Sequence, residues 1–158
     1  MKTPYHERLP DVPAPALFPR EPGQSLSVRA EVVSYGDDRR TRGLRTMNTV
    51  TGDAGAAVVE QLRGIAPDLA DWIVDFSYGD VLSRPGLDGR TRQLATIAAL
   101  TSLGNAQPQL KVHVTGALKL GCRPQEIIEV ILQMAVFAGF PAAINALAVA
   151  REVFDAAK

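Results

Sequence analysis

His113 is the residue in this chain whose type and position are best suited to chemistry. On a helix it follows Leu110 by three residues and precedes Ala117 by four, so it shares their inward-facing stripe. A neutral imidazole in a partly apolar pocket can donate or accept a proton near pH 7. The spacing alone fits equally well a buried histidine whose ring is satisfied by a backbone carbonyl.

Composition excludes several other kinds of chemistry. Cys122 is the only cysteine, so the chain has neither an internal disulfide nor an intrachain thiol pair for redox work or zinc binding, and we expect no metal and no cofactor. The charges of the 17 basic and 17 acidic residues cancel, which favours a small molecule or another protein chain over nucleic acid as the partner. No apolar stretch approaches 18 residues, so we expect no membrane span and a cytoplasmic protein.

The elements that must position these residues are predicted to be helices. Proline or aspartate recurs where a helix is expected to start, and glycine recurs where one is expected to end. The chain length and apolar content suit a single domain with one hydrophobic core. Asp38 and Asp88 are expected N-caps, and a third helix is expected to run from Pro67 to about Gly79 with one apolar stripe. The full set of predicted helices covers about residues 39–52, 54–65, 67–79, 89–103, 108–120, 124–138 and 142–156.

The N-terminal part differs in composition. Residues 1–24 contain six prolines, which is incompatible with regular helix. We therefore expect an extended arm over residues 1–37, with a possible short strand at 28–33, followed by an all-α domain over residues 38–158. In that domain the segment from Ile127 to Phe137 has little polar face, which predicts burial in a homo-oligomer.

Three sequence blocks together carry a family resemblance. These are Ser83-Arg-Pro-Gly-Leu-Asp88, His113-Val-Thr-Gly-Ala-Leu-Lys-Leu-Gly121 and the segment from Gln133 to Asn145. In order and spacing they resemble the γ-carboxymuconolactone decarboxylase family, over about residues 43–154. The resemblance implies an all-α, alkylhydroperoxidase D-like fold, a hexamer built from dimers, and a cofactor-independent decarboxylase. The thiol peroxidase branch of that superfamily would need cysteines at the positions of Ala106 and Gln109. Neither residue is a cysteine, so thiol peroxidase chemistry has no nucleophile in this chain.

The resemblance also assigns expected site residues. His113 occupies the position of the family's proposed catalytic histidine, and Asp80 is expected to orient it as a second catalytic residue. Tyr78 is expected to add a hydroxyl to the substrate pocket. Arg84, with Arg92 beside it, is expected to bind a substrate carboxylate through two parallel hydrogen bonds.

Two readings of the function stay open beside a decarboxylase of a carboxymuconolactone-type butenolide acid. Met47, Tyr78 and Leu82 depart from residues that the family often has at these positions, which favours a cofactor-free isomerase or cyclase acting on a larger biosynthetic intermediate. An inaccessible His113 would instead favour a non-catalytic, ligand-binding oligomer.

Overall fold

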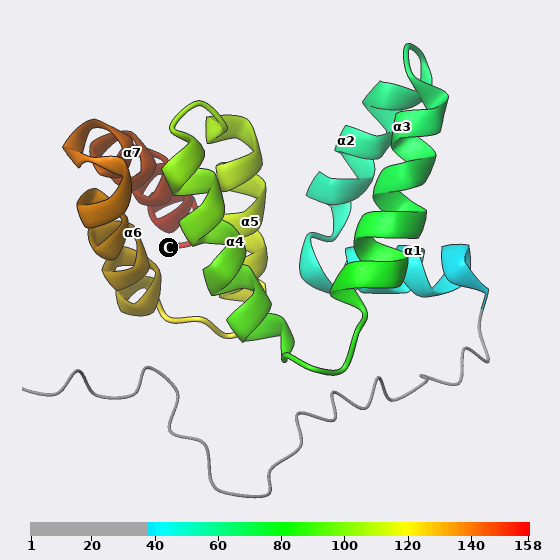
Figure 1. Ribbon diagram of the computed structural model, residues 1–158, viewed down its shortest axis with the longest axis horizontal. Coiled ribbons are helices and arrows are strands. Elements are labelled where there is room, and N and C mark those ends of the chain that lie inside the picture. Colours follow the sequence, from blue (N-terminus) through cyan, green and yellow to red (C-terminus); the bar gives the residue numbers. More distant parts are fainter. Residues whose placement is uncertain (1–37) are drawn as a thin grey trace, which may run out of the picture. The chain divides into compact units, whose positions relative to one another are not determined.

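The computed structural model describes residues 38–158, and the described residues form an all-α domain, as predicted (Figure 1). The expected arm over residues 1–37, and the possible strand within it, lie outside the described residues. The boundary at residue 38 therefore stays a prediction. Within residues 38–158 the elements are α1 (Arg39–Val50), α2 (Asp53–Arg63), α3 (Pro67–Trp72), the π-helix η1 (Ile73–Leu82), α4 (Gly89–Leu103), α5 (Gln107–Lys119), α6 (Pro124–Ala138) and α7 (Phe140–Ala156).

Local side-chain chemistry sets several helix ends where the sequence predicts them. The Asp38 carboxylate accepts a hydrogen bond from the Thr41 amide at 2.8 Å, and Asp88 accepts one from the Thr91 amide at 2.9 Å. Both are N-caps that satisfy amides left without a partner at a helix start. Gly104 ends α4 with φ of +71°, a left-handed conformation that glycine adopts without a steric penalty.

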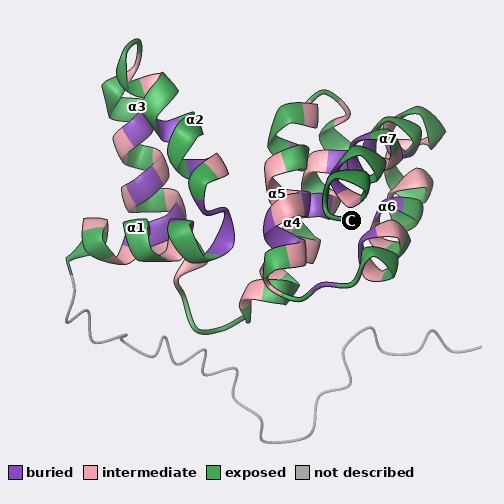
Figure 2. Cartoon of the chain, turned by 180° about the vertical axis from the view of Figure 1, so that it is seen from behind, coloured by how far each residue is buried: buried purple, intermediate pink, exposed green. Residues whose placement is uncertain are grey.

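Buried side chains gather in two clusters (Figure 2). One lies among α1, α2, α3 and η1 and is built on Met47, Val50, Val59, Ala70, Val74 and Tyr78. The other lies among α4, α5, α6 and α7 and is built on Ile97, Leu110, Val114, Ala117, Cys122, Ile127, Ile131, Ala143, Ala146, Val149, Ala150 and Val153.

Two glycines let helices approach each other closely. A Cβ on Gly43 of α1 would overlap the Val74 carbonyl oxygen of η1, and a Cβ on Gly116 of α5 would overlap the Val50 carbonyl oxygen at the end of α1. Only glycine fits where backbones come this near. Gly116 lies one turn after His113, so this contact also fixes the turn of α5 that carries the histidine.

The helix from Pro67 differs from the prediction beyond Trp72. The chain continues as a π-helix to Leu82 instead of ending near Gly79. The expected apolar stripe of Leu69, Trp72, Ile73 and Phe76 is not the buried one, because Trp72 and Phe76 stay 64% and 56% exposed. The buried stripe consists of Ala70, Val74 and Tyr78. In a π-helix the backbone hydrogen bonds join residues i and i+5, so residues four to five apart share a face, whereas in an α-helix residues three to four apart do so.

Candidate functional site

A pocket of about 240 Å³ opens beside His113. Its walls come from α2, from one face of η1 and from the first two turns of α5. Most of the lining is apolar, and no lysine or arginine among the described residues contributes to it. The lining residues are Gly55, Val58, Val59, Ile73, Ser77, Tyr78, Leu82, Pro108, Gln109, Val112 and His113.

His113 reaches this pocket from α5 and is held by a residue of α4. Its Nδ1 lies 2.9 Å from Oε1 of Gln93, whose side chain is buried. Burial lowers the pKa of His113 below its ordinary value, because the charged imidazolium loses solvation. At neutral pH the ring is therefore neutral, with one nitrogen engaged by Gln93.

Tyr78 faces the same pocket from η1. Its hydroxyl lies 3.5 Å from Thr51 Oγ1, and Thr51 donates its own hydrogen to the Met47 carbonyl at 3.0 Å. Because the Thr51 hydrogen is used in this way, the phenol is the donor in the Tyr78–Thr51 pair. Burial raises the pKa of Tyr78, so the phenol stays neutral. Tyr78 and His113 thus line the same pocket.

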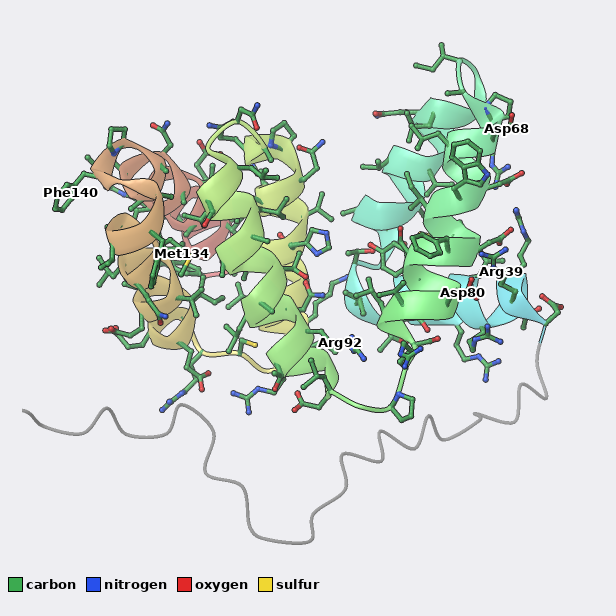
Figure 3. The ribbon with its side chains drawn as sticks, viewed as in Figure 1. Arg39, Asp68, Asp80, Arg92, Met134 and Phe140 are labelled. Atoms are coloured by element: carbon green, nitrogen blue, oxygen red, sulfur yellow. The ribbon has the colours of Figure 1, made fainter. Side chains whose placement is uncertain are left out.

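Asp80 lies elsewhere. Its carboxylate forms ion pairs with Arg39 and Arg42 of α1, and the labelled Arg39 and Asp80 lie next to each other in Figure 3. The expectation that Asp80 orients His113 thus does not match the geometry, in which Gln93 holds that ring. The π-helix explains the difference: with α-helical spacing Asp80 would share a face with Ile73, whereas the i to i+5 register puts Tyr78 and Leu82 there.

The arginines expected to bind a carboxylate also lie outside the pocket lining. Arg92 donates to the Leu87 carbonyl at 3.2 Å and to the Arg84 carbonyl at 2.8 Å, so its guanidinium secures the loop before α4. Figure 3 labels Arg92 at this end of α4. The Arg84 side chain is exposed. Neither guanidinium is brought to His113.

Comparison with known proteins identifies the family. The model of the carboxymuconolactone decarboxylase family matches residues 67–152, a range that includes His113, Tyr78 and Gln93. The chain belongs to the carboxymuconolactone decarboxylase family. Its domain accordingly has the all-α, alkylhydroperoxidase-like fold of that family.

The chain is similar to three known proteins. It is 35% identical to the 4-carboxymuconolactone decarboxylase of Acinetobacter baylyi, over 75% of this chain and 88% of that one. It is 40% identical to an uncharacterized 15.0 kDa protein of Paracoccus denitrificans, over 59% and 70% of the two chains. It is 34% identical to the nitrosuccinic acid decarboxylase of Metarhizium robertsii, over 52% and 57%. The names of two relatives thus support a decarboxylase-like function.

Two polar side chains beside this pocket were not predicted. Gln93 is 1% exposed and Thr51 is 1% exposed, yet both are polar. Gln93, Ile97 and Thr101 follow each other at intervals of four along the buried face of α4. A glutamine in the buried stripe of a helix needs a hydrogen-bond partner, and this is the signal that could have identified Gln93.

Residues 38–158 contain neither a cluster of metal ligands nor a membrane-spanning helix. No group of three or more histidine, cysteine, aspartate or glutamate side chains there is arranged to hold a metal ion. None of the helices in this range combines the length and the apolar character needed to cross a membrane.

Proposed function

We propose that this protein is a cofactor-independent decarboxylase acting on a carboxymuconolactone-type butenolide acid. The observation that carries the proposal is His113, a neutral imidazole held by Gln93 at the wall of an apolar pocket. Such a group can take up and return one proton where water is scarce. That is the task that decarboxylation of an activated acid leaves to a protein.

The electrons in this reaction have an acceptor within the substrate. The bond between the ring carbon and the carboxylate carbon breaks, carbon dioxide leaves, and the electron pair passes into the conjugated lactone carbonyl as a dienolate. One proton then adds to a ring carbon and gives the enol-lactone. The acid is thus converted into carbon dioxide and the enol-lactone in a balanced reaction that requires no oxidant or reductant.

In this proposal His113 carries the proton. Neutral His113 accepts the proton of the acid as the acid enters the pocket, and the imidazolium then returns that proton to a ring carbon of the dienolate. Tyr78 borders the same pocket, and its hydroxyl oxygen keeps lone pairs for a ligand while its hydrogen points to Thr51. The phenol thus contributes an acceptor and an aromatic wall.

The apolar lining favours loss of the carboxylate. A guanidinium in the pocket would stabilise the charged starting acid, whereas an apolar wall destabilises it relative to the dispersed charge of the transition state. No cationic side chain among the described residues lines this pocket. Arg84 and Arg92 could act on a substrate only from outside this lining.

The relatives support the same reaction class. One is named as a decarboxylase of 4-carboxymuconolactone and another as a decarboxylase of nitrosuccinic acid. A lactone carbonyl and a nitro group can both accept the electron pair that carbon dioxide leaves behind. We extend this common chemistry to the present chain as part of the proposal.

We also propose that the active form is a homo-oligomer, in line with the expected hexamer. Helix α6 and the start of α7 expose large apolar side chains, with Val136 79%, Phe137 75% and Phe140 75% exposed. Figure 3 labels Phe140 at the start of α7, and the residue points away from the helices around it. Covering such a surface with a second copy of the chain would remove it from water.

The pocket lining also favours one alternative. An apolar wall without a cation suits a larger, less charged acid or ketone, as a cofactor-free tailoring enzyme in biosynthesis would bind. This alternative uses the same His113 as proton carrier but requires no release of carbon dioxide.

The test is a substrate panel with carbon dioxide as the readout. Purified protein is incubated with γ-carboxymuconolactone and, in parallel, with nitrosuccinic acid, and released carbon dioxide and lactone product are quantified together. The proposal predicts one carbon dioxide per lactone consumed. Release from nitrosuccinic acid alone would overturn the butenolide substrate, and no release from either acid would favour the tailoring alternative.

A further inference from the structure

The contact between Gln93 and His113 joins two helices within the site. Gln93 of α4 is 1% exposed, and its Oε1 lies 2.9 Å from Nδ1 of His113 on α5. The two residues are 20 positions apart in the sequence, so the contact exists only in the folded protein. Gly116, one turn after His113, has no side chain, and even a Cβ there would stay 3.5 Å from Gln93 Oε1. The amide therefore has room to meet the ring.

An amide oxygen can only accept a hydrogen bond. With Oε1 as the partner atom, the hydrogen between Gln93 and His113 lies on Nδ1, and in the neutral ring the second nitrogen, Nε2, then carries a lone pair. Within residues 38–158, Nδ1 is the ring nitrogen with a hydrogen-bond partner, which leaves Nε2 for the pocket.

We propose that Gln93 is a positioning residue that fixes the Nδ1–H tautomer of His113, so that Nε2 is the proton acceptor of the site. A ligand must then present an acidic hydrogen to Nε2, and the imidazolium formed returns that hydrogen from the same atom. The catalytic meaning of this arrangement rests on the proposed function. The assignment of the tautomer is independent of the proposed function.

A glutamine differs from a carboxylate in this role. A carboxylate on Nδ1 would stabilise the imidazolium and raise the pKa of His113, whereas a neutral amide orients the ring and leaves burial to lower the pKa. The other titratable group that lines the pocket is the Tyr78 phenol of η1, which stays neutral. α2 and α4 contribute no charged side chain to the lining, and the Lys111–Glu152 pair between α5 and α7 is exposed.

The chain is well suited to a direct measurement, because it has only two histidines, His6 and His113. In a His6→Gln background, long-range proton–nitrogen spectra of labelled protein report which ring nitrogen of His113 carries the hydrogen. We expect a protonated Nδ1 and an unprotonated Nε2 at neutral pH, without any substrate. Hydrogen on Nε2 in this protein would overturn the proposal, since it would mean that the Gln93 amide is turned and donates from its nitrogen.

Two variants test Gln93 itself. Gln93→Met removes the acceptor at similar volume, and we expect the tautomer to shift toward hydrogen on Nε2. Gln93→Glu keeps the shape and adds a charge, and we expect the titration midpoint of His113 to rise by about 1–3 pH units. Spectra and titrations unchanged in both variants would refute the role of Gln93.

A matched control is Gln109→Met. Gln109 lines the same pocket from α5, and Gln93 is the residue that bonds to the His113 ring. Its substitution should leave the tautomer unchanged, and a shift as large as that of Gln93→Met would count against the proposal. Because the spectra need no substrate, the predicted tautomer in a protein without decarboxylase activity would refute the proposed function and leave this inference standing.

Discussion

Gly116→Ala places a methyl group where α5 meets the end of α1. The new Cβ would overlap the Val50 carbonyl oxygen, and this neighbour is backbone, which cannot rotate out of the way. Helix α5 must therefore move away from α1. Overpacking of this kind costs roughly 1–3 kcal/mol, and a rigid backbone neighbour favours the upper end.

A gain in helix propensity opposes this cost. Alanine is more favourable than glycine inside a helix by about 1 kcal/mol. With a cost of about 3 kcal/mol for the overlap, the net loss in the free energy of unfolding is about 2 kcal/mol. Because His113 lies one turn away on the same helix, we also expect turnover of the substrate to fall.

Urea unfolding at fixed protein concentration measures the loss. The control is Gly64→Ala at the C-terminal end of α2, where no atom lies near the new methyl group and φ of −73° suits alanine. That change should be neutral or stabilise the fold by up to about 1 kcal/mol. A Gly116→Ala protein as stable as Gly64→Ala would refute the close approach of α5 to α1.

Three further predictions follow from the same structure. Burial lowers the pKa of His113 below its ordinary value of 6.5, so the unfolded chain binds a proton more readily than the folded protein, and the free energy of unfolding falls as the pH drops from 6.5 to the folded pKa. The urea midpoint should therefore fall more on acidification in wild type than in His113→Gln, and equal falls would contradict this. Val136→Glu should reduce the oligomer mass in light scattering, and a wild type that is monomeric at micromolar concentration would exclude the oligomer. Activity should survive both EDTA and Cys122→Ala, and its loss in either, with folding intact, would contradict a cofactor-free mechanism.

The helix ends could be predicted because they depend on neighbours in the sequence. Asp88 caps α4 through an amide three residues ahead, and α6 runs from Pro124 to Ala138, as predicted, between a proline and a glycine. His113 could be placed on an inward stripe for the same reason, since three to four residue spacing is local information.

The register of η1 could not be predicted in this way. A π-helix is rare, and the apolar pattern from Pro67 fits an α-helix equally well. The change of register places Tyr78 in the pocket and brings Asp80 to the arginines of α1. The position of Asp80 thus depends on how η1 packs against α1, which no short motif encodes.

The partner of His113 depends on tertiary structure in a similar way. Gln93 follows Arg92 and precedes Leu94 on α4, and its contact with α5 depends on the packing of the two helices. Its polarity inside a buried stripe is visible in the sequence, but the identity of its partner is not.

The role of His113 as the proton carrier is tested most directly by the turnover of the His113→Gln variant. Glutamine keeps a hydrogen-bonding amide of similar reach but cannot titrate near neutral pH. With carbon dioxide release as the readout, we predict a loss of turnover on the order of 10²–10⁴-fold, typical for a removed acid–base group, with the oligomeric state and melting temperature little changed. Turnover close to that of wild type would contradict the assignment of His113 as the proton carrier.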